Sequence, residues 1–326
     1  MISRKKRWLR IGVSLFVLGA ILFGVGFAMD GFGDFKSTVE PRTASYDAAE
    51  IDSIWINAIT ADVLVEKADA GRVEVTYFEG EHEGVDVMVK DGVLTIKQTQ
   101  GRTWRDYIRF SWSGSRKIVV RVPEVRGDAT FLSTSGNVFV TDVPVTGTAH
   151  YGSTSGKVAA SGSAGSLAMV TTSGDIDMRD MTVAGDASAI TTSGKIKASG
   201  LIVGGAWKAI STSGSLAASD IGAASFTFGS VSGKIRLDGI DAGDGAISAM
   251  TTSGAIDIMG VSAASYKFGT VSGDVTGMLP GSARDYTIKS GTVSGKNALP
   301  TKQAGGPVDI SVTTTSGDID LSFEEE

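Results

Sequence analysis

Apolar and polar residues alternate with a period of two through the second half of the chain, around a phrase that recurs ten times between residues 133 and 321. The phrase is Ser/Thr-Thr/Val-Ser-Gly. Two positions after its glycine stands an aliphatic residue in nine copies, as at Ile176 and Ile196, and Asn297 is the exception. The neighbouring positions are mostly polar or charged, as at Asp175 and Lys195. A period of two predicts that each copy opens with a strand that is apolar on one face.

The residues before the glycine alternate too, with apolar side chains five and seven positions earlier, as at Met169 and Leu167. The apolar phase shifts by one residue at the glycine, so the chain is expected to turn a corner there. We expect glycine at this corner because it adopts positive φ without a Cβ clash. The predicted corner glycines are Gly136, Gly156, Gly174, Gly194, Gly214, Gly233, Gly254, Gly273, Gly295 and Gly317.

The spacing of these glycines, 18 to 22 residues, is that of a repeat architecture. Two short strands per copy, without a helical pattern or an Asn-Gly hairpin turn, favour one coil of a parallel β-helix over a stack of hairpins. The sequence therefore predicts an all-β fold, a single-chain β-solenoid with about 20 residues per coil. Each repeat is expected to lie on the one before, ~4.8 Å away.

Stacking would align the serine that precedes each glycine into a column along the solenoid. A half-buried hydroxyl without a partner costs about 1–3 kcal/mol, and the neighbouring coil would offer that partner. We interpret this column as a structural serine ladder rather than a set of catalytic nucleophiles. Its members are Ser135, Ser155, Ser173, Ser193, Ser213, Ser232, Ser253, Ser272, Ser294 and Ser316.

The segment Ile11–Met29 carries no charge and follows five basic residues within the first ten. Nineteen helical residues reach about 28 Å, close to the thickness of the hydrocarbon core. The basic residues predict that the N-terminus stays in the cytoplasm and that the rest lies outside. A cleaved signal peptide is the alternative, with a small-x-small site at residues 26–28.

The pattern divides the chain into five predicted parts. Residues 1–10 form a basic cytoplasmic tail, 11–29 a transmembrane helix and 30–49 a linker with Gly31, Gly33 and Pro41. Residues 50–123 alternate without the repeated phrase, which predicts an irregular N-terminal solenoid or cap. Residues 124–326 form the regular repeat solenoid.

The net charge of −6 includes five positive charges near the N-terminus, so the remainder carries −6 − 5 = −11. An acidic body is a poor nucleic-acid binder, because phosphate binding needs clustered Lys and Arg. The chain has no cysteine, so no disulfide stabilises it.

One stretch, residues 101–115, is both aromatic and basic on this acidic chain. Aromatics with arginines can stack on sugars or bind anionic wall polymers or lipid head groups. The alternative is that these side chains cap the open end of the solenoid. The possible ligand-binding loop consists of Trp104, Arg105, Tyr107, Arg109 and Trp112.

Two pairs of carboxylates, Asp175/Asp177 and Asp318/Asp320, are predicted to point outward from one strand face. They could bind calcium between coils. Pairing of Asp175 with lysines of the neighbouring copies is the favoured interpretation. The sequence shows no Ser-His-Asp set, zinc-ligand spacing or phosphate loop. No cofactor and no catalytic site are therefore predicted.

The phrase Thr-Thr-Ser-Gly-Asp-Ile-Asp at 171–177 and 314–320 resembles the signature of the DUF4097 family. Residues 50–56 are similar to that family's first strand, and residues 117–123 to the strand before its repeats. The resemblance covers about residues 46–326. It implies a right-handed parallel β-helix outside the cytoplasmic membrane in a bacterial cell envelope. Members are often labelled adhesins, but the family has no agreed biochemical activity.

The predicted function is that of a membrane-anchored, extracytoplasmic β-solenoid that acts as a non-catalytic structural or adhesion-like interaction module. The bilayer is its partner through Ile11–Met29, with a cell-wall polymer or an envelope protein as further partners. The alternative is an accessory sensor or regulator of envelope stress that works through a membrane partner. A carbohydrate-active β-helix enzyme is less favoured.

Overall fold

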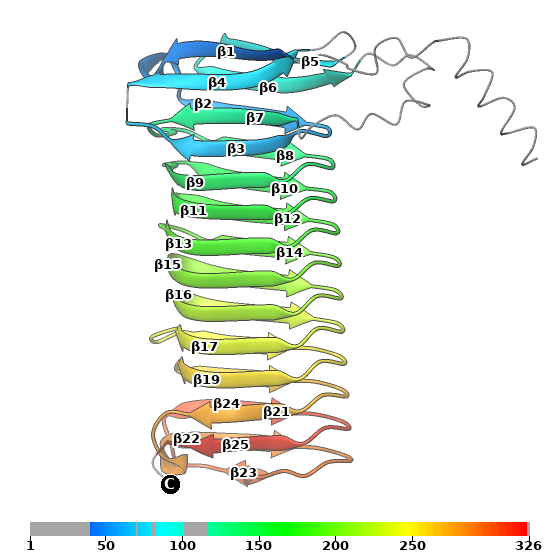
Figure 1. Ribbon diagram of the computed structural model, residues 1–326. Helices are drawn as coiled ribbons and strands as arrows, with labels where there is room; N and C mark the ends of the chain where they lie inside the picture. The colour runs from blue at the N-terminus through cyan, green and yellow to red at the C-terminus, as the bar shows by residue number, and fades with distance from the viewer. Residues whose placement is uncertain (1–39, 70, 80–82, 101–115, 325–326) are drawn as a thin grey trace, which may run out of the picture. The chain divides into compact units, whose positions relative to one another are not determined.

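The computed structural model describes residues 40–69, 71–79, 83–100 and 116–324. They form an all-β solenoid of about nine turns with about 20 residues per turn (Figure 1). Two short 3-10 helices, Ala48–Glu50 and Ala283–Asp285, interrupt the strands. Within these described ranges, no helix has the length and apolar character needed to cross a bilayer. The predicted tail and membrane helix lie outside the described residues.

Each regular coil contributes one strand to each of two layers. We call them the pre-glycine and post-glycine layers, after the side of the repeated glycine on which their strands lie. Strands of neighbouring coils pair in parallel within both layers. The pre-glycine layer includes β8 (Ala129–Ser133), β10 (Thr148–Ser153), β12 (Ser166–Thr171), β14 (Ala187–Thr191), β18 (Ala246–Met250) and β20 (Ser265–Gly269).

The post-glycine layer faces the viewer in Figure 1. It includes β9 (Val138–Pro144), β11 (Val158–Ala164), β13 (Ile176–Val183), β17 (Ile235–Asp241), β19 (Ile256–Ser262) and β21 (Val275–Leu279). The long strands β15 (Ile196–Ser211) and β16 (Leu216–Ser230) run from the post-glycine layer of one coil into the pre-glycine layer of the next.

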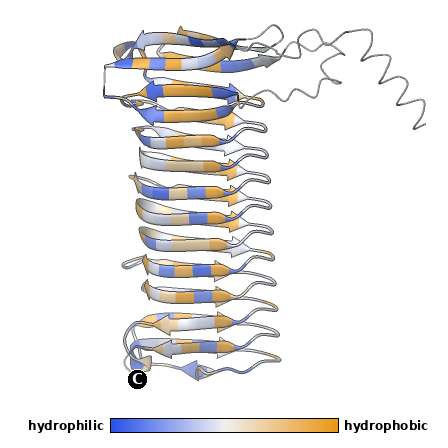
Figure 2. Cartoon of the chain, viewed as in Figure 1, coloured by the Kyte–Doolittle hydropathy of each residue, from blue (hydrophilic) through white to orange (hydrophobic). Residues whose placement is uncertain are grey.

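The core lies between the two layers and confirms the predicted alternation. Figure 2 shows hydrophobic and hydrophilic positions alternating along the strands. Trp207, Phe226 and Phe228 are at most 2% exposed and form an aromatic cluster in neighbouring coils. The Trp207 ring packs edge-on against both phenylalanines, with centroids 6.0 and 5.2 Å away. Large inward side chains in some coils are thus accommodated beside alanine-rich coils.

The corner glycines are required for a different reason from the one predicted. All ten belong to the described residues, and none of them has positive φ. Instead, the coils approach each other closely at this column. A Cβ on Gly194 would lie 1.7 Å from the carbonyl oxygen of Gly174 in the neighbouring coil. Any side chain would therefore push two coils apart.

The serine ladder is also corrected by the structure. The ten serines before the glycines are exposed, whereas the Thr or Ser two positions earlier is buried in nine coils. In one coil, Thr191 Oγ1 donates to the carbonyl oxygen of Gly174 (3.2 Å) and accepts from the backbone N–H of Gly194 (3.0 Å). The tight corner thus turns this hydroxyl inward and leaves Ser193 in solvent. The buried ladder is Ser133, Ser153, Thr171, Thr191, Ser211, Ser230, Thr251, Thr270 and Thr314.

A second column of special backbone positions lies six residues after the glycine, where the post-glycine strand bulges. Asp142, Asp180 and Asp220 have φ of 55°, 48° and 55° there. Asp tolerates this left-handed region better than most non-glycine residues. In four other coils the same place is occupied by Gly162, Gly200, Gly239 and Gly260, all with positive φ.

At the N-terminal end the coils do not follow chain order. Strand β2 (Ser53–Ala58) pairs in parallel with β6 (Val93–Gln100) on one side and with β8 on the other. Strand β3 (Asp62–Lys67) lies likewise between β7 (Lys117–Val122) and β9, as Figure 1 shows. Antiparallel strands cover this end: β1 (Glu40–Asp47), β4 (Arg72–Glu79) and β5 (Glu83–Lys90).

The C-terminal end shows the same interruption. Strand β24 (Val308–Thr313) lies between β20 and β22 (Tyr286–Gly291), although β22 comes earlier in the chain. Strand β25 (Ile319–Phe323) pairs with β21, and β23 (Lys302–Gln303) pairs antiparallel with β22. The prediction that each repeat lies on the one before is therefore wrong at both ends.

Candidate functional site

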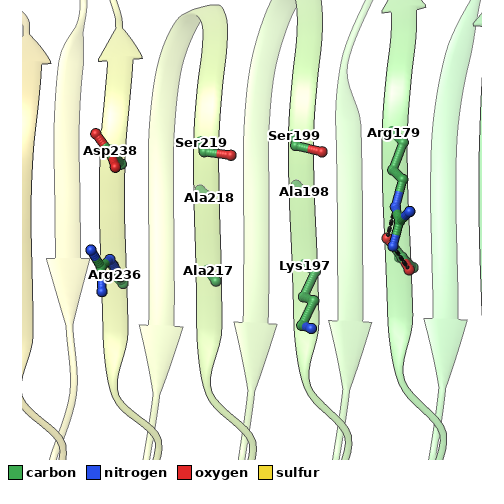
Figure 3. A pocket seen from close by; sticks show the side chains of 10 residues that line it. Arg179, Lys197, Ala198, Ser199, Ala217, Ala218, Ser219, Arg236 and Asp238 are labelled. Carbon is green, nitrogen blue, oxygen red and sulfur yellow. Dashed lines mark hydrogen bonds and ion pairs between the residues drawn. The ribbon is translucent and has the colours of Figure 1, made fainter.

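A shallow depression of about 400 Å³ lies on the outside of the post-glycine layer, across β13, β15, β16 and β17. Its floor is formed by the two middle strands, whose outward side chains at Ser199, Ala217 and Ser219 are small, while the side chains of Ala198 and Ala218 face the core. Figure 3 shows charged side chains of β13 and β17 on either side of this floor. The four strands span about 14 Å at ~4.8 Å per step. The small outward side chains of β15 and β16 thus leave a hollow in an otherwise regular face.

The β13 wall of the depression is internally neutralised. Asp177 is 8% exposed and accepts from Arg179 Nη2 (2.8 Å) and Lys157 Nζ (2.8 Å). Burial alone would raise the pKa of the Asp177 carboxyl. The hydrogen bonds and positive charges of Arg179 and Lys157 outweigh burial and hold that pKa below its ordinary value.

Two cations of the depression remain without an acidic partner. Neither Lys197 on β15 nor Arg236 on β17 makes an ion pair with any residue that the structure describes. They occupy one row of the face, on either side of Ala217. Ser199 and Ser219 place two hydroxyls in the adjacent row. The depression therefore offers two cations about 10 Å apart, together with hydroxyl groups.

A second surface lies on the outside of the pre-glycine layer, and we call it the cationic face. It consists of two rows of aligned residues. The lysine row is, in stacking order, Thr130, His150, Ala168, Ser188, Lys208, Thr227, Ser248, Lys267, Ser311 and Lys289. The aliphatic row is Leu132, Gly152, Val170, Ile190, Ile210, Gly229, Met250, Gly269, Thr313 and Gly291. Neither row contains an acidic residue.

Large side chains of the aliphatic row extend over its glycines. A Cβ on Gly269 would lie 2.8 Å from Met250 Cε, and one on Gly152 would lie 3.0 Å from Leu132 Cδ2. The row is therefore apolar even where it lacks a side chain of its own. Its aliphatic side chains are substantially exposed, by 38% at Ile190 and 42% at Met250.

Neither surface was identified by the candidate residues chosen from the sequence. The aromatic and basic loop with Trp104, Arg105, Tyr107, Arg109 and Trp112 lies outside the described residues. The depression could have been found from the small residues at outward positions of two successive copies, Ser199, Ala217 and Ser219. The cationic face could have been found by aligning the outward positions before each glycine.

The first carboxylate of each predicted pair hydrogen-bonds to the backbone of a neighbouring coil, and the two pairs do not share one outward arrangement. Asp175 Oδ1 accepts from the backbone N–H of Lys195 (2.8 Å), and Asp318 Oδ1 accepts from that of Lys296 (2.7 Å). Asp177 was expected to point outward but is buried by its two cationic partners, while Asp320 is exposed. The predicted pairing of Asp175 with lysine side chains is replaced by these backbone contacts. Among the described residues, no three His, Cys, Asp or Glu side chains are grouped to hold a metal ion.

The repeated phrase places one glycine of the close column and one hydroxyl of the buried ladder in each regular coil. Residues 51–322 match the family model described as Toastrack DUF4097. The chain belongs to the DUF4097 family. The resemblance predicted from the Thr-Thr-Ser-Gly copies and the two preceding strands is thereby confirmed.

Solved structures that match this chain have low sequence identity to it. A "putative lipid binding protein" from Parabacteroides distasonis is 17% identical, with 86% of this chain and 96% of that chain covered and a TM-score of 0.41. A "putative adhesin" from Bacteroides fragilis is 15% identical, with coverages of 86% and 97% and a TM-score of 0.36. The comparison with curated proteins gave no match.

Proposed function

We propose that this DUF4097 protein is a non-catalytic interaction module of the cell envelope, held in the membrane by Ile11–Met29 with its coils on the outer side. The uncharged segment and the basic residues before it support the anchor and its orientation. The contact site is the depression on the post-glycine layer, and its ligand is an anionic, hydroxyl-rich wall polymer.

The observation that carries this proposal is the presence of two cations that make no ion pair with the described residues, on a floor of small side chains. Lys197 and Arg236 can bind successive phosphate or carboxylate groups of one chain, because the distance between their strands spans about 10 Å. Ser199 and Ser219 can exchange hydrogen bonds with the polymer's hydroxyls. The open floor at Ala217 leaves room for the chain to pass between the cations.

The test is co-sedimentation of the full chain, kept in mild detergent, with isolated cell walls before and after extraction of their anionic polymers. We expect Lys197→Ala/Arg236→Ala to weaken binding to intact walls by about an order of magnitude, since two exposed charge contacts of up to about 1 kcal/mol each are lost and about 1.4 kcal/mol is tenfold. The matched control, Lys97→Ala/Lys117→Ala, removes the same charge from other exposed positions.

Equal loss in both variants would contradict a localised site, because it would indicate attraction by charge alone. Binding that survives polymer extraction unchanged would contradict the proposed ligand. Circular dichroism on each variant checks that the solenoid is folded.

A further inference from the structure

The cationic face of the pre-glycine layer differs from the rest of this acidic chain. Its two rows contain Lys208, Lys267 and Lys289 but no carboxylate. On the opposite layer, Asp177, Asp238 and other carboxylates stand among the cations. The lysines therefore have no acidic neighbour within these two rows, and the nearest carboxylates of the layer, Asp186 and Asp309, stand in the next outward row, beyond the lysines as seen from the aliphatic row.

The aliphatic row beside the lysines is long and continuous. From Leu132 to Met250 it crosses six coil steps, or about 29 Å at ~4.8 Å per step. Three valines at the neighbouring corner, Val231, Val271 and Val293, add exposed fractions of 46%, 46% and 80%. Exposed apolar side chains that gather in this way mark contact surfaces more often than isolated ones do.

We propose that the cationic face rests on the head-group region of a bilayer that contains anionic lipid. The lysines match the negative head groups, and the aliphatic row contacts the apolar boundary just beneath them. The valine and isoleucine side chains are short and only partly exposed, so the contact is shallow and does not insert an element into the bilayer. A second copy of the chain fits this face less well, because an isologous pairing would bring lysine rows toward each other.

This surface goes beyond the wall-polymer site and lies on the other side of the core. The two layers pack back to back through their inward side chains, so a membrane on one layer leaves the depression on the other layer accessible. The two proposals can therefore fail independently of each other.

The chain contains no cysteine, which allows a single reporter to be placed on either layer. The full chain carrying Ile190→Cys on the cationic face, or Ala217→Cys on the opposite layer, is labelled with an environment-sensitive fluorophore. It is reconstituted into vesicles of phosphatidylcholine alone or of phosphatidylcholine with phosphatidylglycerol, each with a lipid-borne quencher at the head-group depth. Because the readout compares two faces of one molecule, it does not depend on whether Ile11–Met29 also anchors the chain.

We expect strong quenching at position 190 with anionic vesicles, weak quenching there with neutral vesicles, and weak quenching at position 217 with both. Adding Lys208→Ala/Lys267→Ala should lower the quenching at position 190 severalfold, whereas Lys67→Ala/Lys117→Ala, at exposed positions of the opposite layer, should leave it unchanged. Circular dichroism confirms that each labelled chain is folded.

Equal quenching at positions 190 and 217, or none at 190 in anionic vesicles, would overturn the proposal. Equal quenching at 190 in neutral and anionic vesicles would overturn the role of the lysines. Disulfide-linked dimers through position 190 in lipid-free detergent, together with no lipid quenching, would show that a second copy occupies the face instead.

Discussion

Nine coil corners are each held by one small side chain that makes two hydrogen bonds. The Thr191 hydroxyl accepts from the backbone N–H of Gly194 in its own coil and donates to the carbonyl oxygen of Gly174 in the preceding coil. Both backbone groups belong to buried glycines, so water cannot replace the hydroxyl. The hydroxyl therefore joins the turn of the chain to the stacking of the coils.

Thr191→Val keeps the size of this side chain but removes the hydroxyl. We expect it to lower the free energy of unfolding by about 1–3 kcal/mol, because a buried N–H and a buried carbonyl lose their partner. Ser193→Ala, two residues away and exposed, should change it by less than about 0.5 kcal/mol. Denaturant unfolding of both variants measures the difference, and a larger loss for Ser193→Ala would restore the ladder predicted from the sequence.

Asp177 gives the fold a dependence on pH. Its pKa is lowered in the folded state because Arg179 and Lys157 outweigh its burial. A group with a depressed folded pKa stabilises the fold above its unfolded pKa of 3.8, and this contribution is lost as pH falls through the folded value. The stability difference between the wild type and Asp177→Asn should therefore be largest near neutral pH and shrink below about pH 4. Unfolding curves across this range measure it, and a constant difference would contradict the ion-pair origin.

At the scale of the strand pair, the column of glycines sets how closely the coils can approach. The carbonyl oxygen of one glycine occupies the place where the next glycine would have a Cβ. This contact is repeated from Gly136 to Gly295, so the post-glycine and pre-glycine strands of all regular coils depend on it.

Gly194→Ala should lower the free energy of unfolding by about 3 kcal/mol, because its Cβ would overlap the carbonyl oxygen of Gly174. Gly222→Ala is the matched control on strand β16, where a Cβ would meet nothing within 4 Å and φ is not positive. Thermal or denaturant unfolding compares the two. Similar losses in both would indicate that backbone freedom, rather than coil contact, explains why glycine recurs at the corner in every copy.

The strands were predictable because alternation is a local property. Leu167, Met169 and Ile176 are buried as their positions in the repeat require. The corner was less predictable, since a local pattern does not fix whether Thr191 or Ser193 turns inward. Nor does it show that Gly194 is needed for contact with another coil rather than for its own φ. The depression depends on which copies become neighbours, so it appears only when the coils are stacked.

At the scale of the whole described unit, the ends are built differently from the middle. Strand β22 pairs with the stack through β24, which follows it in the chain, while the short β23 pairs with β22 alone. The order of these coils is invisible in the sequence, because the copies at Gly273, Gly295 and Gly317 carry the same phrase.

Removal of residues 301–326 should therefore release more than the last coil. It takes away β24 and β25, so β22 loses its parallel partner and the edge of β20 becomes exposed. We expect limited proteolysis to cut the shortened chain near residues 286–299, which should resist in the full chain. Protection of this segment in the shortened chain would mean that β22 can pair directly with β20, as simple sequential stacking would require.

The interrupted order at both ends also determines how the protein responds to mechanical tension. In a solenoid wound in simple sequence, a pull on either terminus peels off the outermost coil, one row of hydrogen bonds at a time. Here β24 has a parallel neighbour on each side, as β2 and β3 do at the other end. A force applied through the chain ends first reaches β1 and β25, which each pair with one strand, and must then draw out a strand held on both flanks, so the bonds on two sides are loaded together. A tether between a membrane and a wall that is built in this way would lose its terminal strands but would resist unravelling beyond them.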